Sequence, residues 1–267
     1  MTSAPLAPLV DRWQSNDFPN LPGRLVVPPP ARALFLAGMA AHAAGPVLAI
    51  VPGERDAEDL AEDVRLFSES VVFMPAWETL PFEHVSPNAA TMARRVEARH
   101  LLAKGPGGTV VIASARSVSQ RISPSDSEPI SGRVGETVGF DQLIERLAQG
   151  GYHRTDQVEA RGEFSVRGGI VDLFPAQAEE PVRLDFWGDH LDDARVFSIS
   201  SQRSVEKVDG FVAYPAREFR PDQAVSSEAR TLLEKEAWAA STWDRLSEGV
   251  LFPGMESWLP WLAPPLT

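Results

Sequence analysis

Cysteine is missing from all 267 residues of this chain, and long apolar runs are missing as well. The first absence excludes disulfides, thiolate nucleophiles and every cysteine-based zinc site. No apolar run reaches the roughly eighteen residues that a membrane-spanning helix needs, so we expect no membrane partner. The five histidines contain no HExxH-type pair, which leaves no local metal motif.

Basic residues are also few in this chain. The chain has 25 Lys and Arg against 37 Asp and Glu, a formal net charge of −12. Proteins that hold a DNA duplex present a basic face to its phosphates. The one short basic stretch, Arg94, Arg95 and Arg99, is diluted by Glu97. We therefore expect this chain not to hold DNA itself. Its first residues lack the order of a secretory signal, which predicts a cytoplasmic protein.

Short apolar runs alternate with helical patterns in the first half of the chain. Residues 1–30 are rich in proline and predict an extended lead-in. Runs of four to five apolar residues are typical of strands buried on both faces of a parallel sheet, and they occupy residues 33–37, 47–51, 71–74 and 109–113. Helical spacing covers residues 56–67 and 88–104. This alternation predicts one α/β domain over residues 31–121.

The pattern changes in the second half. Residues 123–135 are polar and rich in Pro, Gly and Ser, which predicts a linker, and 141–149 predict a short helix. A period of two then predicts antiparallel strands over 163–174, 182–187 and 194–199. Residues 122–213 are thus expected to form a small α+β domain.

Residues 214–267 begin with an expected helix at 226–246 and end in an aromatic run, 258–262. Such a run needs a cover. Either the chain is a piece of a longer protein, or the run folds back onto the core.

The sequence has two glycine-containing segments to consider as nucleotide sites, at 38–43 and at 105–108, and we expect neither to bind a nucleotide. The second precedes a predicted strand and is interpreted as a turn. A phosphate-binding loop reads GxxxxGK[ST], because glycine amides cup the phosphate while Lys and Ser or Thr handle charge and magnesium. The segment Gly38 to Ala43, placed after the first expected strand, has neither the Lys nor the hydroxyl. We expect a degenerate loop that binds no ATP. Asp192 and Asp193 predict a solvated hairpin, so no catalytic set, cofactor or metal is expected.

One strand pair does carry a candidate binding surface. Alternation in residues 183–187 turns Leu184 and Phe186 to one face, and Arg183, Asp185 and Trp187 to the other. Leucine and phenylalanine claim the core, which leaves the tryptophan outside.

The same alternation in residues 164–167 points Phe164 inward and Arg167 outward. An exposed tryptophan beside arginines is typical of protein-binding hot spots. The alternative is that Trp187 packs under a loop while the arginines pair with Asp185 or Asp172.

The same residues carry a family resemblance. The chain resembles the second domain shared by UvrB and the transcription-repair coupling factors in GYHRTDQV (151–158) and RGEFSVRGGIVDLFP (161–175). VRLDFWGD (182–189), SQRS (201–204), PAWETLPF (75–82) and SP (86–87) favour the coupling factors. The resemblance covers nearly all of residues 32–221.

This resemblance implies a fold: an α/β, degenerate P-loop-type parallel-sheet domain like UvrB 1a/1b with an inserted small α+β domain like UvrB domain 2. Residues 31–121 would be the 1a-like part, 122–213 the UvrA-docking domain, and 214–267 the start of the 1b-like part.

The resemblance also implies a function: recruitment of UvrA to excision repair by a factor that acts on RNA polymerase stalled at DNA lesions. The polymerase-binding part and the ATP- and magnesium-dependent motor on double-stranded DNA would lie outside this chain.

Carried over by position, the UvrA-binding residues would be Arg167, Arg183 and Trp187, with Arg154 as a further contact. Ser165 stands where UvrB has another arginine, so the UvrB contact set is not fully kept. The alternative is a UvrB-like, ATP-dependent protein that binds damaged DNA. The missing phosphate-loop Lys and the lack of a tyrosine-rich hairpin between Met74 and Met92 argue against it.

Overall fold

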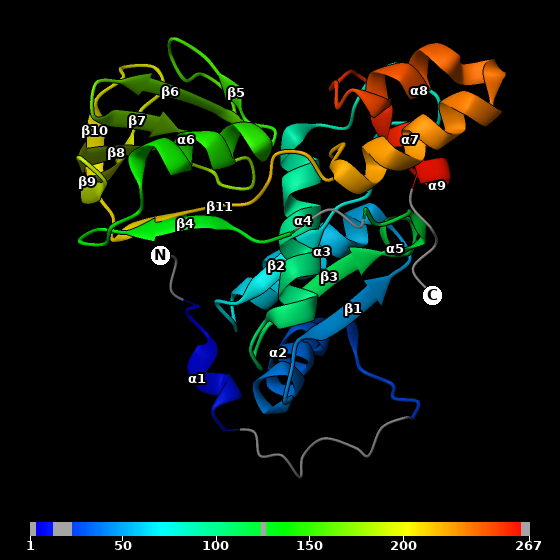
Figure 1. Cartoon of the computed structure of the whole chain (residues 1–267). Helices are drawn as coiled ribbons and strands as arrows, with labels where there is room; N and C mark the ends of the chain where they lie inside the picture. The colour runs from blue at the N-terminus through cyan, green and yellow to red at the C-terminus, as the bar shows by residue number, and fades with distance from the viewer. Residues whose placement is uncertain (1–3, 13–22, 124–126, 263–267) are drawn as a thin grey trace. The chain divides into compact units, whose positions relative to one another are not determined.

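The structure is a computed structural model that describes residues 4–12, 23–123 and 127–262 (Figure 1). It divides into two units. The first contains the chain up to Ala76 together with Glu97–Gln120, and the second contains Trp77–Val96 together with everything from Arg121 onward. Within these described ranges, no helix combines the length and apolar character needed to cross a bilayer.

The first unit is built on a three-stranded parallel sheet. Its strands are β1 (Val47–Val51), β2 (Val71–Met74) and β3 (Val110–Ser114), in the order β1-β3-β2. Its helices are α1 (Ala7–Val10), α2 (Arg32–His42), α3 (Glu54–Arg65), α5 (Ala115–Ser119) and the second half of α4 (Ala89–Lys104), and a short 3-10 turn, η2 (Pro29–Ala31), leads into α2. The predicted α/β character of this part is confirmed.

Helices pack on both faces of this sheet. On one face, small side chains of α2 and α3 such as Ala37 and Ala61 pack against Phe73 and Ile112. On the other face, Ala98 of α4 packs against β2 and β3. β3 is therefore buried along its whole length, as its apolar run predicts. The prediction is wrong for β1, where Leu48 and Ile50 are exposed, because α4 covers only β2 and β3.

The first apolar run, residues 33–37, is a helix and not a strand. It forms the first turns of α2, whose buried residues Ala33, Ala37, Gly38 and Ala40 recur at helical spacing. Alanine has the highest helix propensity, so the run satisfies its backbone locally. Gly38 to His42 is consequently helical, and the degenerate phosphate loop expected there is no loop at all.

The junction that does follow the first strand is β1 to α3. Asp56 in the first turn of α3 accepts a hydrogen bond from the backbone N–H of Gly53, at 3.2 Å. Glu54 accepts from the backbone N–H of Ala76 at 2.6 Å and from the Ser114 hydroxyl at 2.5 Å. Two carboxylates therefore occupy the helix N-terminus where a nucleotide-binding α/β domain would hold a phosphate.

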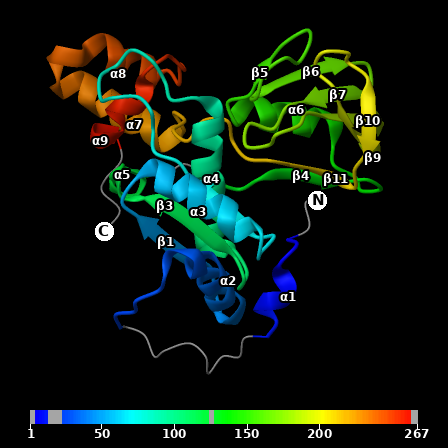
Figure 2. The same cartoon turned by 180° about the vertical axis from the view of Figure 1, so that it is seen from behind.

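The second unit contains a six-stranded sheet in the order β10-β9-β8-β7-β6-β5, in which only the β5–β6 pair is parallel (Figure 2). The strands are β5 (His153–Arg154), β6 (Glu163–Arg167), β7 (Ile170–Leu173), β8 (Val182–Trp187), β9 (His190–Phe197) and β10 (Ser204–Lys207). The predicted antiparallel strands are confirmed, and the stretch 163–174 is a hairpin that turns at Gly168.

One face of this sheet is buried. Helix α6 (Phe140–Gln149) packs Leu143 and Leu147 against Phe164 and Leu184 of the sheet. The strands β4 (Ile130–Arg133) and β11 (Gly210–Ala213) pair antiparallel and add Ile130 to the same core. The linker predicted at 123–135 is thus wrong over β4. Its partner strand lies about eighty residues further along the chain, which makes the pairing invisible to a local pattern.

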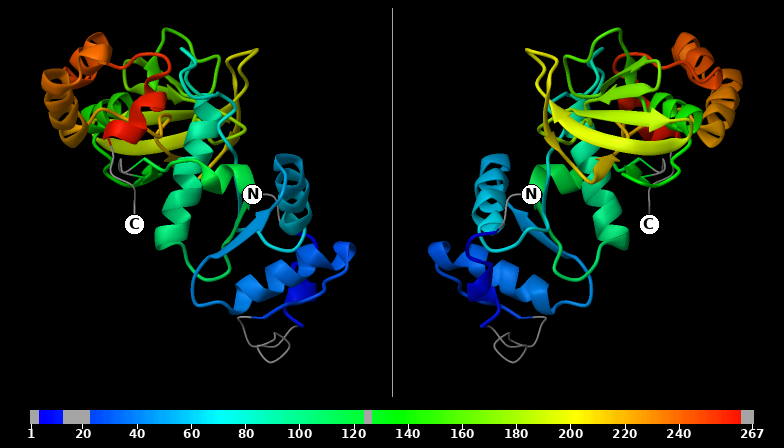
Figure 3. Two further views of the ribbon diagram at one scale, coloured as in Figure 1. Left: turned by 90° about the vertical axis from the view of Figure 1, so that its right-hand side faces the viewer. Right: turned by 90° about the vertical axis from the view of Figure 1, so that its left-hand side faces the viewer.

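The last part of the second unit is helical (Figure 3). It consists of α7 (Gln223–Lys235), η3 (Ala237–Ala239), α8 (Ala240–Ser247), η4 (Met255–Trp258) and α9 (Leu259–Leu262). The helical character predicted over 226–246 is confirmed: α7, η3 and α8 cover this range, and Trp243 of α8 is buried in their common core. Leu259 and Leu262 join the same core. The run therefore packs against α7 and α8, as the fold-back interpretation expects, and this packing does not test whether the chain is a piece of a longer protein.

Buried polar groups join the loop that carries the 75–82 motif, and helix α4 after it, to the segment between β11 and α7. The indole N–H of Trp77 donates to Glu218 at 2.8 Å, and the Arg95 guanidinium forms an ion pair with the same carboxylate at 2.7 Å. The side chains of Arg95 and Glu218 are 0% and 2% exposed. A buried charge pair of this kind is a constraint on packing, because neither charge can lose its partner cheaply.

A second contact holds the same loop. The Ser86 hydroxyl donates to Glu256 at 2.7 Å, and Arg217 donates to Glu256 at 3.0 Å. Burial raises the pKa of Glu256 above its ordinary value, although these two partners act in the opposite direction. A raised pKa means that the folded chain disfavours the charged form, so the contribution of this group to stability falls as the pH rises through its folded pKa.

Glu218→Ala should lower the free energy of unfolding by about 3–5 kcal/mol, because it leaves the buried Arg95 guanidinium uncompensated. The double variant Arg95→Met/Glu218→Leu should lose less than Glu218→Ala alone, since it removes both charges together. Urea unfolding followed by circular dichroism measures both. A double variant that loses as much as Glu218→Ala, or more, would contradict this account.

Candidate protein-docking site

The candidate site lies on the face of the six-stranded sheet opposite α6. Strand alternation assigns the two faces: Phe164 and Leu184 are 1% and 0% exposed and lie in the core with α6. Arg167, Arg183 and Trp187 then belong to the other face. The orientation predicted from the two-residue period is confirmed.

Trp187 is open to solvent, with 84% of its surface exposed. It ends β8 and lies opposite His190 of β9. The chain turns between these strands at Gly188, whose φ of +61° favours glycine. No loop covers the indole, so the interpretation that Trp187 packs under a neighbouring segment is wrong.

The two arginines share one buried carboxylate. Asp172 of β7 accepts from Nη2 of Arg167 at 2.6 Å, and from Nε and Nη2 of Arg183 at 2.6 and 2.9 Å. Its side chain is 0% exposed, whereas those of Arg167 and Arg183 are 53% and 18% exposed. The pairing with Asp172 anticipated in the alternative interpretation is therefore present, together with the exposed tryptophan.

Arg183 has further contacts that hold it in place. Its guanidinium carbon lies 5.1 Å from the ring centroid of Phe197, and its Nη1 donates to the backbone carbonyl of Gln202 at 3.2 Å. Gln202 has a positive φ of +56°, and its side-chain amide donates to the carbonyls of Val158 and Ile199. The hydrogen bonds to Asp172 raise the pKa of Arg183 above its ordinary value, so the guanidinium stays charged.

Arg154 does not join this group. It lies on the short edge strand β5, and its register partner is the inward-facing Phe164. The side chain is exposed. Of the predicted site residues, the structure brings Arg167 and Arg183 together through Asp172, places Trp187 four residues along β8 from Arg183, and leaves Arg154 apart.

Ser165, the position where UvrB carries another arginine, is buried in the same sheet. It is 1% exposed and is the cross-strand partner of Asp172. Its hydroxyl has no hydrogen-bond partner among the described residues. A serine at this position adds no charge to the surface, so the predicted site residues that carry charge on this face are Arg167 and Arg183. Arg195, the cross-strand partner of Arg183, is paired with Asp193.

Two contributors to the site were not predicted as site residues, although Gln202 belongs to the SQRS motif at 201–204. Gln202 and Phe197 reach Arg183 from the end of β9 and the loop after it, and no local periodicity points to them. Asp172 does have a signal. It is an acidic residue inside the apolar strand Ile170-Val171-Asp172-Leu173, where a charge needs a partner.

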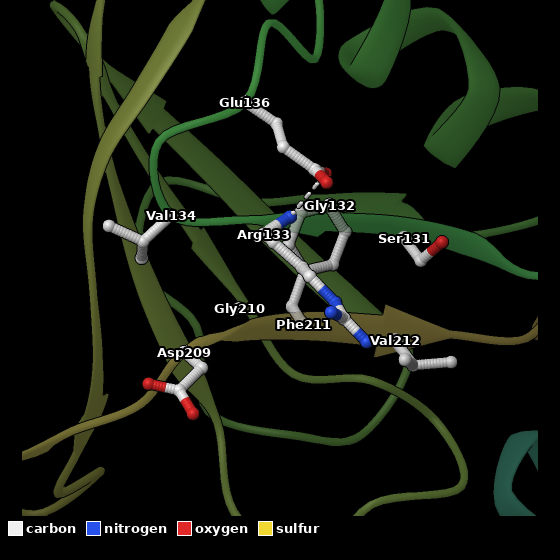
Figure 4. Close-up of a pocket in the computed structure, with 9 residues that line it drawn as sticks. All are labelled: Ser131, Gly132, Arg133, Val134, Glu136, Asp209, Gly210, Phe211 and Val212. Carbon is white, nitrogen blue, oxygen red and sulfur yellow. Dashed lines mark hydrogen bonds between the residues drawn. The ribbon is translucent and has the colours of Figure 1, made fainter.

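A surface hollow elsewhere in the unit carries no chemistry of its own. It has a volume of about 920 Å³ and is lined by the β4–β11 pair, including Arg133, Asp209 and Phe211 (Figure 4). Glu136 accepts a hydrogen bond from the backbone N–H of Arg133 at 3.0 Å. None of the predicted site residues lines it. In the ranges that the structure describes, no group of three or more His, Asp or Glu side chains could hold a metal ion.

A comparison with protein families assigns the part of the second unit that carries the six-stranded sheet to a known domain family. Residues 130–219 match the UvrB interaction domain, and this range contains the sheet, α6 and all four predicted site residues. The class of protein is therefore one that carries a UvrB interaction domain.

The curated relatives narrow the class. The chain is 38% identical over 258 residues to the transcription-repair-coupling factor of Mycobacterium tuberculosis (strain CDC 1551 / Oshkosh), covering 90% of this chain and 21% of the relative. For the Escherichia coli (strain K12) factor, identity is 33% over 238 residues, with 86% and 21% covered. For that of Bacillus subtilis (strain 168), identity is 30% over 200 residues, with 72% and 17% covered.

The chain is thus a homologue of the transcription-repair-coupling factors, and the resemblance predicted from its sequence to their amino-terminal, UvrB-like region is confirmed. It spans about a fifth of the length of the curated relatives that it matches.

Trp187→Ala should change the free energy of unfolding by less than about 0.5 kcal/mol, because the indole makes little contact with the rest of the unit. Leu184→Ala on the same strand should cost about 2–5 kcal/mol, because it leaves a cavity in the core. Urea unfolding of the two variants tests the assignment of faces. A loss above about 1 kcal/mol for Trp187→Ala would mean that the indole is packed.

Proposed function

We propose that this chain is the UvrA-recruiting part of a transcription-coupled nucleotide excision repair factor, and that it docks UvrA through Trp187, Arg167 and Arg183. One observation carries the proposal: an 84% exposed tryptophan lies on the same sheet face as two fixed arginines, inside a UvrB interaction domain. Tryptophan and arginine are the residue types most enriched in binding hot spots.

The physical properties of the three residues suit docking. Trp187 offers a large apolar surface with only two side-chain torsions to order on binding, so its burial costs little entropy. Arg167 and Arg183 retain outward donors for a carboxylate or a carbonyl of the partner. Arg154, which lies apart from them, is proposed only as a contact at the periphery of the interface.

The junction between β1 and α3 in the first unit supports a role in docking and not in nucleotide binding. Glu54 and Asp56 place two carboxylates at the N-terminus of α3, where the charge would repel a phosphate. The helix α2 begins behind Pro28, Pro29 and Pro30, three residues without a backbone N–H to cup an anion. We propose that this unit is a 1a-like, degenerate nucleotide fold, continued by a 1b-like part after residue 213, and has no ATPase activity of its own.

This chain spans about a fifth of the length of each of these relatives, and their further activities enter only as proposals for a whole factor. Such a factor would act on RNA polymerase stalled at a lesion and would move on double-stranded DNA with ATP and magnesium. The net charge of −12 agrees with a part that contacts protein and not DNA.

Trp187→Ala and Arg183→Ala should each weaken binding of the chain to purified UvrA by about 30- to 1,000-fold, the equivalent of about 2–4 kcal/mol for the loss of a hot-spot residue. Calorimetry with the full chain measures the affinity. Trp238→Ala and Arg133→Ala are matched controls, because these exposed residues lie outside the docking face, and both should bind as the unaltered chain does. Unchanged affinity in both docking variants would remove the proposal.

The alternative function, a UvrB-like ATP-dependent protein, is separated by a direct titration. ATP with magnesium should give no heat of binding at micromolar concentrations, because the required Lys and hydroxyl are missing and carboxylates occupy the candidate phosphate site. A micromolar affinity for ATP would favour the alternative over an inert fold.

A further inference from the structure

Asp172 occupies a particular place between the two arginines. Arg167 is on β6 and Arg183 is on β8, and the strand between them is β7, which carries Asp172. The register pairs Asp172 with Ser165 on one side and with Arg183 on the other. One carboxylate thus joins side chains from three adjacent strands.

This carboxylate cannot contact a partner protein itself. Its side chain is 0% exposed, and its two oxygens already accept three hydrogen bonds from guanidinium groups. A carboxylate offers about four acceptor positions, so its capacity is nearly filled. Whatever Asp172 contributes to binding, it contributes through Arg167 and Arg183.

The arginines keep donors for a partner while they are held. A guanidinium has five N–H donors in a rigid fork. Arg183 commits Nε to one Asp172 oxygen, Nη2 to the other, and Nη1 to the carbonyl of Gln202. One N–H on each terminal nitrogen then remains. Arg167 commits only Nη2, and half of its side chain is exposed.

Without a negative charge between them, two neighbouring guanidinium groups repel and spread into solvent over many rotamers. With it, the local charge is one unit less positive, and the fork of Arg183 is fixed to both oxygens of the carboxylate. Ordering of long side chains is one of the main costs of association, and a geometry fixed in advance avoids that cost.

We propose that Asp172 is a positioning residue of the docking site, which sets the affinity for UvrA by holding Arg167 and Arg183 in their binding geometry before the partner arrives. This inference rests on the proposed function and deepens it. It assigns a role in binding to a residue that is fully buried and therefore does not touch UvrA.

Positioning and simple charge attraction predict opposite outcomes for one variant. Asp172→Asn keeps the size of the side chain and removes its charge. Suppose that Asp172 acted only through its charge, by reducing the positive charge that Arg167 and Arg183 offer to carboxylates of UvrA. Asp172→Asn would then bind UvrA more tightly at low salt. If Asp172 positions the arginines, the same variant binds more weakly although the surface has become more positive.

The experiment measures affinity of the full chain for UvrA at several salt concentrations. Asp172→Asn should weaken binding by about 5- to 150-fold, the cost of ordering two long side chains, and should steepen the salt dependence because the patch becomes one charge more positive. In an Arg167→Ala/Arg183→Ala background, Asp172→Asn should have no further effect, because the side chains on which it acts are gone. A purely structural role would leave the salt dependence unmoved.

A second variant keeps the test open if Asp172→Asn folds poorly. Arg183→Lys retains the charge at a partly exposed position but cannot bind both carboxylate oxygens at once. It should weaken binding to a similar degree. Lysine binding as well as arginine would show that the carboxylate supplies only a counter-charge, and would overturn the inference.

A measurement on the chain alone separates this inference from the proposed function. The Nε–H signal of Arg183 in a nitrogen–proton NMR spectrum should be protected from exchange, and should lose that protection in Asp172→Asn. Tight UvrA binding by the unaltered chain with unchanged affinity in Asp172→Asn overturns the positioning role only. No UvrA binding by the unaltered chain overturns both proposals, even if the NMR signal behaves as expected.

Discussion

The register of β6, β7 and β8 is the constraint on which the docking face depends. These strands bury Phe164, Val171 and Leu184 against α6 on one side. Since side chains alternate along a strand, a slip of one residue would bring the charged set into the core and expose the apolar set. The hydrophobic core therefore fixes which groups face the partner. The same register places a single aspartate between two arginines, so packing on one face organises charge on the other.

The docking face combines two kinds of contact that differ in what they cost the free protein. An exposed tryptophan adds apolar surface to the water-facing side, which isolated domains carry only sparingly. The arginine pair has a different cost, which is the desolvation of the Asp172 carboxylate between them. This cost is offset only while the carboxylate keeps its hydrogen bonds to both arginines. Neither the exposed tryptophan nor the arginine pair adds to the hydrophobic core. Features that cost stability in this way are typical of surfaces that serve binding.

The two units differ in how they use carboxylates. In the first unit, Glu54 and Asp56 serve the backbone and a serine at the start of α3, and this internal use removes the place where a nucleotide phosphate would bind. In the second unit, Asp172 organises guanidinium groups toward the outside, while Glu218 and Glu256 hold the loop that carries the 75–82 motif. The motif that favoured the coupling factors thus has a packing role.

Several features were determined by the sequence alone. The periods of two and of three to four residues fixed the antiparallel strands, the helices α3, α4 and α6, and the outward direction of Arg167, Arg183 and Trp187, because these depend only on neighbours along the chain. Local pattern failed where a distant segment decides the outcome. Ile130 belongs to a strand only because β11 pairs with it, and Leu48 is exposed because α4 covers the other two strands.

The apolar run 33–37 could pack as a strand or as a helix, and helix propensity prevailed. The sharing of Asp172 and the support of Arg183 by Gln202 were likewise decided by tertiary structure, since hydrogen bonds between strands depend on register and on loop conformation, which no local spacing encodes.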